Sequence, residues 1–331
     1  MRYVIGLLIA SLAMAACGGA GDPLTVYSGR SEELIGPLLE DFTEDTGIPV
    51  EVRYGGSADL ALLIDQEGER SPADVFISQS PGAIGFLAER EHLAPIAAET
   101  LELVEPSFRN ADGRWIGLSG RVRVLVYNTD LVDAAELPAS VFELTDPAYE
   151  GRVALAPANG SFQDFVTAMR QVQGDDATLG WLEGMAANNS PEYANNSSIV
   201  QAVARGEAPM GLVNHYYNFR ALAEDPGLPS QNHYFAGEDL GGLVIVTAAG
   251  ILHASTSQDD ANTLLEYLLG ESAQQFLSEE TFEYPLAMGA TPWEGLPPLN
   301  DIGGATLDFD SLGGGLERTK ELIDASGLEG P

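Results

Sequence analysis

The chain has 331 residues, of which 45% are hydrophobic and 20% are charged. This length favours two lobes of about 150 residues each over a single core, and the composition excludes disordered and low-complexity classes. The formal net charge of −35 argues against nucleic-acid binding, because a phosphate backbone requires a basic partner surface. The simplest interpretation of the charge is an acidic, solvated surface.

The first 17 residues predict a secretion signal. A short basic start is followed by an apolar run, Val4–Met14, and by small residues that lead to Cys17, the only cysteine. The run is shorter than the roughly 20 residues of a membrane-spanning helix. This segment resembles a bacterial lipobox, which implies that residues 1–17 are a lipoprotein signal peptide and that Cys17 is lipidated. The alternative is an ordinary signal peptide with an incidental cysteine.

The elements that follow alternate between strands and helices. Ser31 is a predicted helix N-cap, and Gly47 is a predicted helix stop. In this part of the chain we expect strands at residues 24–29, 48–54 and 73–78 and helices at residues 31–46, 57–69 and 81–90. Such alternation predicts a parallel sheet covered by helices.

Two long extended segments, near residues 122–128 and 241–246, are predicted to cross between the lobes. Between them we expect strands at residues 152–156 and 209–213 and helices at residues 161–173, 176–187 and 197–205; two more helices, 259–269 and 272–278, follow. We therefore predict an α/β fold of two lobes, each a mainly parallel sheet flanked by helices, joined by two hinge strands. Lobe one is expected to take residues 22–122 plus 243–296, and lobe two residues 123–242 plus 297–331.

The chemistry is concentrated in Asn214-His215-Tyr216-Tyr217, which follows the predicted strand at 209–213. Ligands of open α/β sheets bind at the carboxyl ends of strands. Phenolate is a hard oxygen donor that suits a ferric ion, although a phenol with a pKa of about 10 has to be deprotonated by the metal. Paired tyrosines are also common packing residues with solvated hydroxyls, so the pair alone leaves both interpretations open.

Several motifs occur in an order that resembles one family. They are Val26-Tyr27-Ser28-Gly29-Arg30, Ser71-Pro72-Ala73-Asp74-Val75-Phe76, residues 118–127, Asn159-Gly160-Ser161-Phe162, Asn196-Ser197, Asn214-His215-Tyr216-Tyr217 and Glu283-Tyr284-Pro285-Leu286. Together they resemble the ferric-ion-binding periplasmic proteins of bacterial iron ABC importers, which are two-lobed solute-binding proteins. The resemblance covers roughly residues 24–278 and implies the periplasmic-binding-protein fold.

By this resemblance Tyr216 and Tyr217 are the iron ligands. A synergistic carbonate or phosphate is expected on small polar groups, namely Asn159, Gly160, Ser161, Asn196 and Asn214. A helix N-terminus at Ser161 would suit an anion. Arg121 and Arg220 are expected to balance the charge from nearby, with Arg30 and Arg123 as weaker candidates.

The chain also departs from the family pattern. Ser31 and Gln79 stand where some members have a ligating histidine and glutamate, and Phe162 lies near the place of a third tyrosine. The first lobe therefore offers no charged ligand, and Ser31 and Gln79 are at most weak neutral contributors. We expect exogenous anions or water to complete the iron shell. His215 is interpreted as a structural residue or one that supports the ligands indirectly.

The resulting hypothesis is capture of Fe(III), with a synergistic anion, by a secreted monomer that is lipid-anchored on the outer face of the cytoplasmic membrane. The protein would deliver iron to an ABC permease and its ATPase. The alternative is a receptor for an oxyanion or a small organic solute without metal. Catalysis is not expected, because the sequence has no G-x-S-x-G, H-E-x-x-H or Gly-rich phosphate loop.

Overall fold

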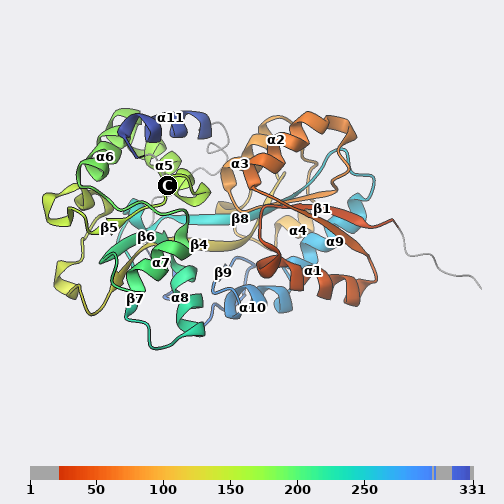
Figure 1. Ribbon diagram of the computed structural model, residues 1–331. Coiled ribbons are helices and arrows are strands. Elements are labelled where there is room, and N and C mark those ends of the chain that lie inside the picture. The colour runs from red at the N-terminus through yellow and green to blue at the C-terminus, as the bar shows by residue number, and fades with distance from the viewer. Residues whose placement is uncertain (1–21, 300–301, 303–314, 329–331) are drawn as a thin grey trace, which may run out of the picture.

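The computed structural model describes residues 22–299, 302 and 315–328 (Figure 1). The predicted signal peptide, residues 1–17 with Cys17, lies outside the described residues, as does part of the 297–331 segment expected in lobe two. Within the described ranges, no helix is both long enough and apolar enough to cross a bilayer.

The strands are joined in the order β2-β1-β3-β8-β4-β6-β5, with β7 and β9 also paired to β4. Their bounds are β1 Leu24–Ser28, β2 Val50–Tyr54, β3 Val75–Ser78, β4 Ile116–Asn128, β5 Val153–Ala154, β6 Met210–Asn214, β7 Ser230–His233, β8 Val244–Ile251 and β9 Tyr284–Pro285. We call β1, β2, β3, β8 and the N-terminal half of β4, with the helices on them, the first lobe. The C-terminal half of β4, with β5, β6 and β7 and their helices, is the second lobe.

Helices cover both sheets (Figure 1). Their bounds are α1 Glu32–Thr46, α2 Ser57–Glu67, α3 Pro81–Glu89, α4 Ala98–Leu101, α5 Gly160–Gln173, α6 Asp175–Ala187, α7 Asn196–Ala204, α8 His215–Glu224, α9 Gln258–Leu268, α10 Glu271–Glu279 and α11 Leu316–Ser326. Helix α11 packs on the second lobe, where the Thr319 and Thr167 hydroxyls lie 2.7 Å apart and Arg170 donates to the Gly315 carbonyl at 2.7 Å.

Strand β4 is the physical link between the lobes. All of its residues are buried, and its first half, Ile116–Val122, pairs with β8. Its second half, Arg123–Asn128, pairs with β6 and β7. The predicted two-lobed α/β class is confirmed, and the extended segment predicted near 122–128 is the second half of this longer strand.

Fewer strands pair in parallel than the alternation of strands and helices predicted. Strand β1 pairs parallel to β2 and β3, and β5 pairs parallel to β6. Every pairing of β4, and that of β3 with β8, is antiparallel. The reason is topological: the chain leaves the first lobe along β4 and returns to it along β8, so these two neighbours must run in opposite directions.

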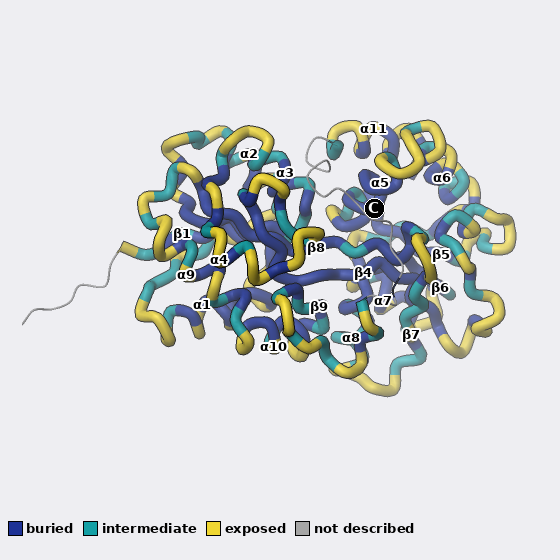
Figure 2. The backbone as a smooth tube through the Cα atoms, turned by 180° about the vertical axis from the view of Figure 1, so that it is seen from behind, coloured by how far each residue is buried: buried dark blue, intermediate teal, exposed yellow. Residues whose placement is uncertain are grey.

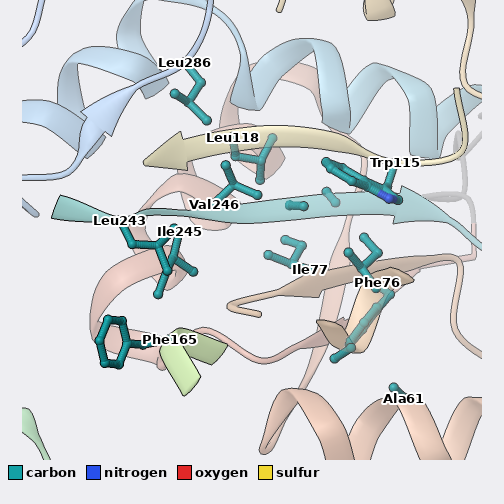
Figure 3. Close-up of a cluster of buried hydrophobic side chains, with 14 of the residues drawn as sticks. Ala61, Phe76, Ile77, Trp115, Leu118, Phe165, Leu243, Ile245, Val246 and Leu286 are labelled. Carbon is teal, nitrogen blue, oxygen red and sulfur yellow. The ribbon is translucent and has the colours of Figure 1, made fainter. Parts of the chain in front are cut away.

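The apolar core of the first lobe surrounds this strand pair. Figure 3 shows Phe76 and Ile77 of β3, Leu118 of β4, and Ile245 and Val246 of β8 packed together, and each is at most 2% exposed. Figure 2 shows the same central strands as the buried part of the molecule. Burial of side chains of this size stabilises a fold by roughly 1.5–3 kcal/mol each, so this packing anchors β4 and β8 in the first lobe.

The predicted limits of α1 are nearly those observed. Gly47 ends the helix with φ 73°, a left-handed conformation that favours glycine. Ser31 occupies the predicted N-cap position, but its side chain makes no capping hydrogen bond and is exposed.

Candidate metal and anion site

Tyr216 and Tyr217 open helix α8 immediately after β6. Tyr216 is fully buried and Tyr217 is partly exposed. Their rings stack with centroids 4.1 Å apart and an interplanar angle of 29°. The two phenols are therefore held side by side at the carboxyl end of a second-lobe strand, the position expected for a ligand in an α/β sheet.

A first-lobe arginine reaches this pair. Arg30 follows β1, is 2% exposed, and its guanidinium carbon lies 5.9 Å from the ring centroid of Tyr216. It forms an ion pair with Glu283, whose other carboxylate oxygen accepts a hydrogen bond from Ser119. The tyrosine pair of one lobe thus meets a positive charge from the other.

Burial raises the pKa of Tyr216 well above that of a free phenol, and negative charge on Tyr217 would raise it further. The guanidinium of Arg30 opposes this pKa shift. Tyr216 is consequently a neutral phenol at neutral pH unless a strong cation displaces its proton.

Small polar side chains form one network beside the tyrosines. The Asn159 Oδ1 atom accepts from Ser161 Oγ at 2.7 Å and from Asn196 Nδ2 at 3.1 Å. The Asn214 backbone N–H donates to Asn196 Oδ1 at 3.2 Å, and Gly160 opens helix α5 between Asn159 and Ser161. The structure therefore brings together the five residues that the sequence motifs predicted for an anion.

Arg123 joins this network from strand β4. Its Nη1 atom donates to Asn214 Oδ1 at 3.2 Å and lies 3.5 Å from Ser161 Oγ. Burial lowers its pKa to about 9, although negative charge on Tyr217 or Asp164 would raise it. The negative charge near Arg123 therefore does not fully compensate the cost of burying its positive charge.

Three buried guanidinium groups, Arg30, Arg121 and Arg123, have nitrogens without a hydrogen-bond partner. These are Nη1 of Arg30, Nε and Nη1 of Arg121, and Nε and Nη2 of Arg123. Buried donors are almost always paired in folded proteins. Unpaired nitrogens on three neighbouring cations indicate a site for a negatively charged group.

Two other predicted contributors, Arg220 and Gln79, make contacts outside the polar network. Arg220 is 32% exposed and its Nη2 lies 3.5 Å from the Glu33 carboxylate of α1, so it joins the lobes at the surface. The Gln79 backbone carbonyl, not its side chain, accepts a hydrogen bond from Arg121. Arg220 was expected ahead of Arg30 and Arg123, and the structure places it partly exposed whereas those two are buried.

His215 has both ring nitrogens engaged by the backbone. Nδ1 accepts from the Val122 N–H at 3.1 Å, so Nε2 carries the proton and donates to the Phe282 carbonyl at 2.8 Å. Burial lowers its pKa to about 4. The imidazole fixes helix α8 to the hinge strand and leaves no nitrogen for a metal. Among the described residues, no group of three or more His, Cys, Asp or Glu side chains could hold a metal ion.

Two buried carboxylates and a serine were missed by sequence reasoning. Glu283 pairs with Arg30, and Asp164 of α5 accepts from Ser80 Oγ at 2.6 Å. Burial raises the pKa of Asp164 to about 6, while the Ser80 hydrogen bond, Arg121 and Arg123 oppose the rise. Asp164 could have been found as the one acid within residues 161–169, a run that is otherwise mostly apolar.

The fold and site define a two-lobed binding protein, and comparison with known proteins gives its family. A family model described as bacterial extracellular solute-binding protein matches residues 70–296, and the chain belongs to this family. It is 35% identical over 329 residues to the Fe(3+)-binding periplasmic protein of Serratia marcescens, covering 97% of this chain and 96% of that protein.

Two solved structures are also similar. Iron-bound HitA from Pseudomonas aeruginosa has 34% identity and a TM-score of 0.88, covering 92% of this chain and 99% of that chain. A Trichodesmium IdiA (FutA) structure in complex with iron and citrate has 27% identity and a TM-score of 0.81, covering 93% and 100%. The family predicted from the motifs is confirmed.

Proposed function

We propose that this protein captures ferric iron in the interlobe cleft and delivers it to an ABC importer. The observation that carries the proposal is the stacked Tyr216–Tyr217 pair beside buried arginines. The relatives named for ferric iron cover nearly the whole chain, which supports the same cargo here.

In this proposal both phenols bind iron as phenolates. Fe(III) displaces their protons, because the pKa of buried Tyr216 is too high for spontaneous ionisation. Arg30 offsets part of the resulting negative charge. Iron is then expected to bind more weakly as the pH falls, since protons compete for the same oxygens.

The surrounding charge supports a synergistic anion. Three buried guanidinium groups face two buried carboxylates, Glu283 and Asp164. An iron(III) that replaces two phenolic protons adds one further positive charge, so an anion of two negative charges would neutralise the centre. We assign carbonate or phosphate to Asn159, Gly160, Ser161, Asn196 and Asn214, with Arg121 and Arg123 facing it; Ser31 and Gln79 contribute weakly or not at all, and Arg220 acts at the rim.

The cellular setting follows from the same proposal. The chain acts outside the cytoplasmic membrane as a monomer, anchored by a lipid on Cys17, and catalyses no reaction; ATP hydrolysis belongs to the importer's ATPase. The lobes comprise residues 22–122 plus 243–296 and residues 123–242 plus 297–331, and they close over the ion as rigid bodies.

A visible absorption titration of metal-stripped protein with ferric citrate tests this function. Wild-type protein should give a phenolate-to-iron charge-transfer band, and Tyr216→Phe and Tyr217→Phe should each lose or strongly weaken it. Tyr193→Phe, a change at a partly exposed tyrosine of the second lobe, is the matched control and should keep the band.

The titration is repeated with phosphate, with bicarbonate and without either. A band that requires one of these anions identifies the ion that completes the shell. If wild-type protein gives no band with any anion, ferric binding by the tyrosines is contradicted, and a receptor for an oxyanion or organic solute becomes the function to test.

A further inference from the structure

One partly buried hydrogen bond connects a first-lobe side chain to a second-lobe side chain. The Ser80 hydroxyl donates to Oδ1 of Asp164 at 2.6 Å. Ser80 lies between β3 and α3 of the first lobe, and Asp164 is in α5 of the second. Figures 1 and 2 both show α3 and α5 on either side of the gap between the lobes. This contact must break when the lobes separate.

The first lobe presents Ser80 in a fixed position. Ser78 Oγ donates to the Ser80 carbonyl at 2.7 Å and lies 3.2 Å from the Ser80 N–H, which donates to it. The Gln79 N–H donates to Ser57 Oγ at 3.0 Å, and the Gln79 carbonyl accepts from Arg121. The backbone of this turn is therefore held within its own lobe and by the hinge strand, which leaves the Ser80 hydroxyl free for the other lobe.

On the opposite side Asp164 is 8% exposed. The charged groups that face it are Arg121 and Arg123 of β4, but the hydrogen bonds of these arginines go elsewhere: Arg121 donates to Gln79 and Arg123 to Asn214. A buried carboxylate without a hydrogen bond is costly. Separating the lobes takes the Ser80 donor away from Asp164, so this hydrogen bond favours the closed arrangement.

We propose that Ser80 and Asp164 form a latch that holds the cleft closed and slows the release of its ligand. Both residues position the lobes, and neither is one of the proposed iron ligands. The latch rests on the proposed function, because the ligand whose release it slows is the one proposed there. The interlobe ion pair of Arg220 with Glu33 is exposed and stabilises closure little.

The chain contains a matched control for this hydrogen bond. Ser255 Oγ donates to Asp74 Oδ1, also at 2.6 Å, and Asp74 is likewise 8% exposed. Both residues flank strands of the first lobe, so this bond is unaffected by lobe separation. Ser255→Ala removes the same chemical contact as Ser80→Ala without touching the cleft.

The test compares the full-length wild type with Ser80→Ala, Asp164→Asn and Ser255→Ala. Ferric citrate and phosphate are the probes, and small-angle X-ray scattering reports closure while transfer to excess EDTA reports release. Ser80→Ala should increase the radius of gyration and speed iron release by about tenfold or more. Asp164→Asn keeps an acceptor oxygen and should stay closed, and Ser255→Ala should release iron like the wild type.

Each outcome decides one proposal. If Ser80→Ala closes and releases iron like the wild type and Ser255→Ala, the latch is wrong even though iron binds. If wild-type protein binds no iron but closes, with phosphate or alone, and Ser80→Ala opens it, the ferric function fails and the latch stands. A wild type that stays open under every condition contradicts the latch.

Discussion

At the scale of single residues, Asp164 is buried with a charge that its neighbours only partly compensate. Burial raises its pKa from 3.8 to about 6. Because the folded pKa is raised, the contribution of this carboxyl to stability is fully present below about pH 3.8 and is lost as the pH rises through about 6. The ionised form is therefore the less favourable one in the closed protein.

Asp164→Asn should behave like a permanently protonated Asp164. Its free energy of unfolding, relative to that of the wild type, should increase between pH 4 and pH 6 and then level off, by on the order of 3 kcal/mol at most. Urea denaturation of the ligand-free proteins at pH 4, 5, 6 and 7 measures this difference. A difference that is constant across the range would show that Asp164 does not titrate there.

Single residues also show which neighbours a sequence can predict. Short motifs carry the tyrosine pair and the Asn159, Ser161, Asn196 and Asn214 cluster, whose members the structure brings together. The partners of Arg30 and Asp164 were not found, because Glu283 is 253 residues from Arg30 and Ser80 is 84 residues from Asp164. The Arg30–Glu283 pair forms only after the first lobe has folded, and the Ser80–Asp164 pair only when the two lobes also meet.

At the scale of secondary structure, the close packing of α7 on β6 positions the polar network. A Cβ atom at Gly211 of β6 would lie 2.2 Å from Ile199 Cγ2 of α7. Only glycine allows the helix this near to the strand. The same approach brings Asn196, which begins α7, within 3.2 Å of the Asn214 N–H at the end of β6.

Gly211→Ala should therefore push α7 away from β6. We expect a loss of about 1–3 kcal/mol in the free energy of unfolding and weaker anion dependence of the iron charge-transfer band. The control is Gly180→Ala in α6, where an added Cβ meets nothing within 4 Å; it should be neutral or stabilising by up to about 1 kcal/mol. Equal stabilities of the two variants would contradict this packing argument.

The helices and strands differ in how well the local sequence predicts them. Helices such as α1 and strands such as β3 were predicted almost to their ends, because local caps and apolar runs define them. Strand β7 has the sequence Ser-Gln-Asn-His, which lacks β-branched and aromatic residues. It becomes a strand through its pairing with β4, and that tertiary interaction leaves no local signal.

At the scale of the whole molecule, the net charge of −35 predicts self-repulsion. At physiological ionic strength, salt screens the interaction between exposed charges that lie more than about 8–10 Å apart. Because most charges here are negative, salt should reduce the repulsion among them more than it weakens the surface ion pairs. The midpoint of thermal unfolding should rise from low ionic strength to about 0.5 M NaCl, where the screening length is shorter than at physiological ionic strength. A midpoint that falls over this range would mean that surface ion pairs outweigh the repulsion.

The path of the chain through the hinge also has a consequence for the order of synthesis. Strand β8, Val244–Ile251, lies between β3 and the first half of β4, so the first sheet lacks a central strand until about three quarters of the polypeptide has been made. A shorter nascent chain would expose the unpaired edges of β3 and β4. A chain that crosses a membrane before it folds gains from this arrangement, because its first-made half cannot complete a stable lobe before most of the chain is available for translocation.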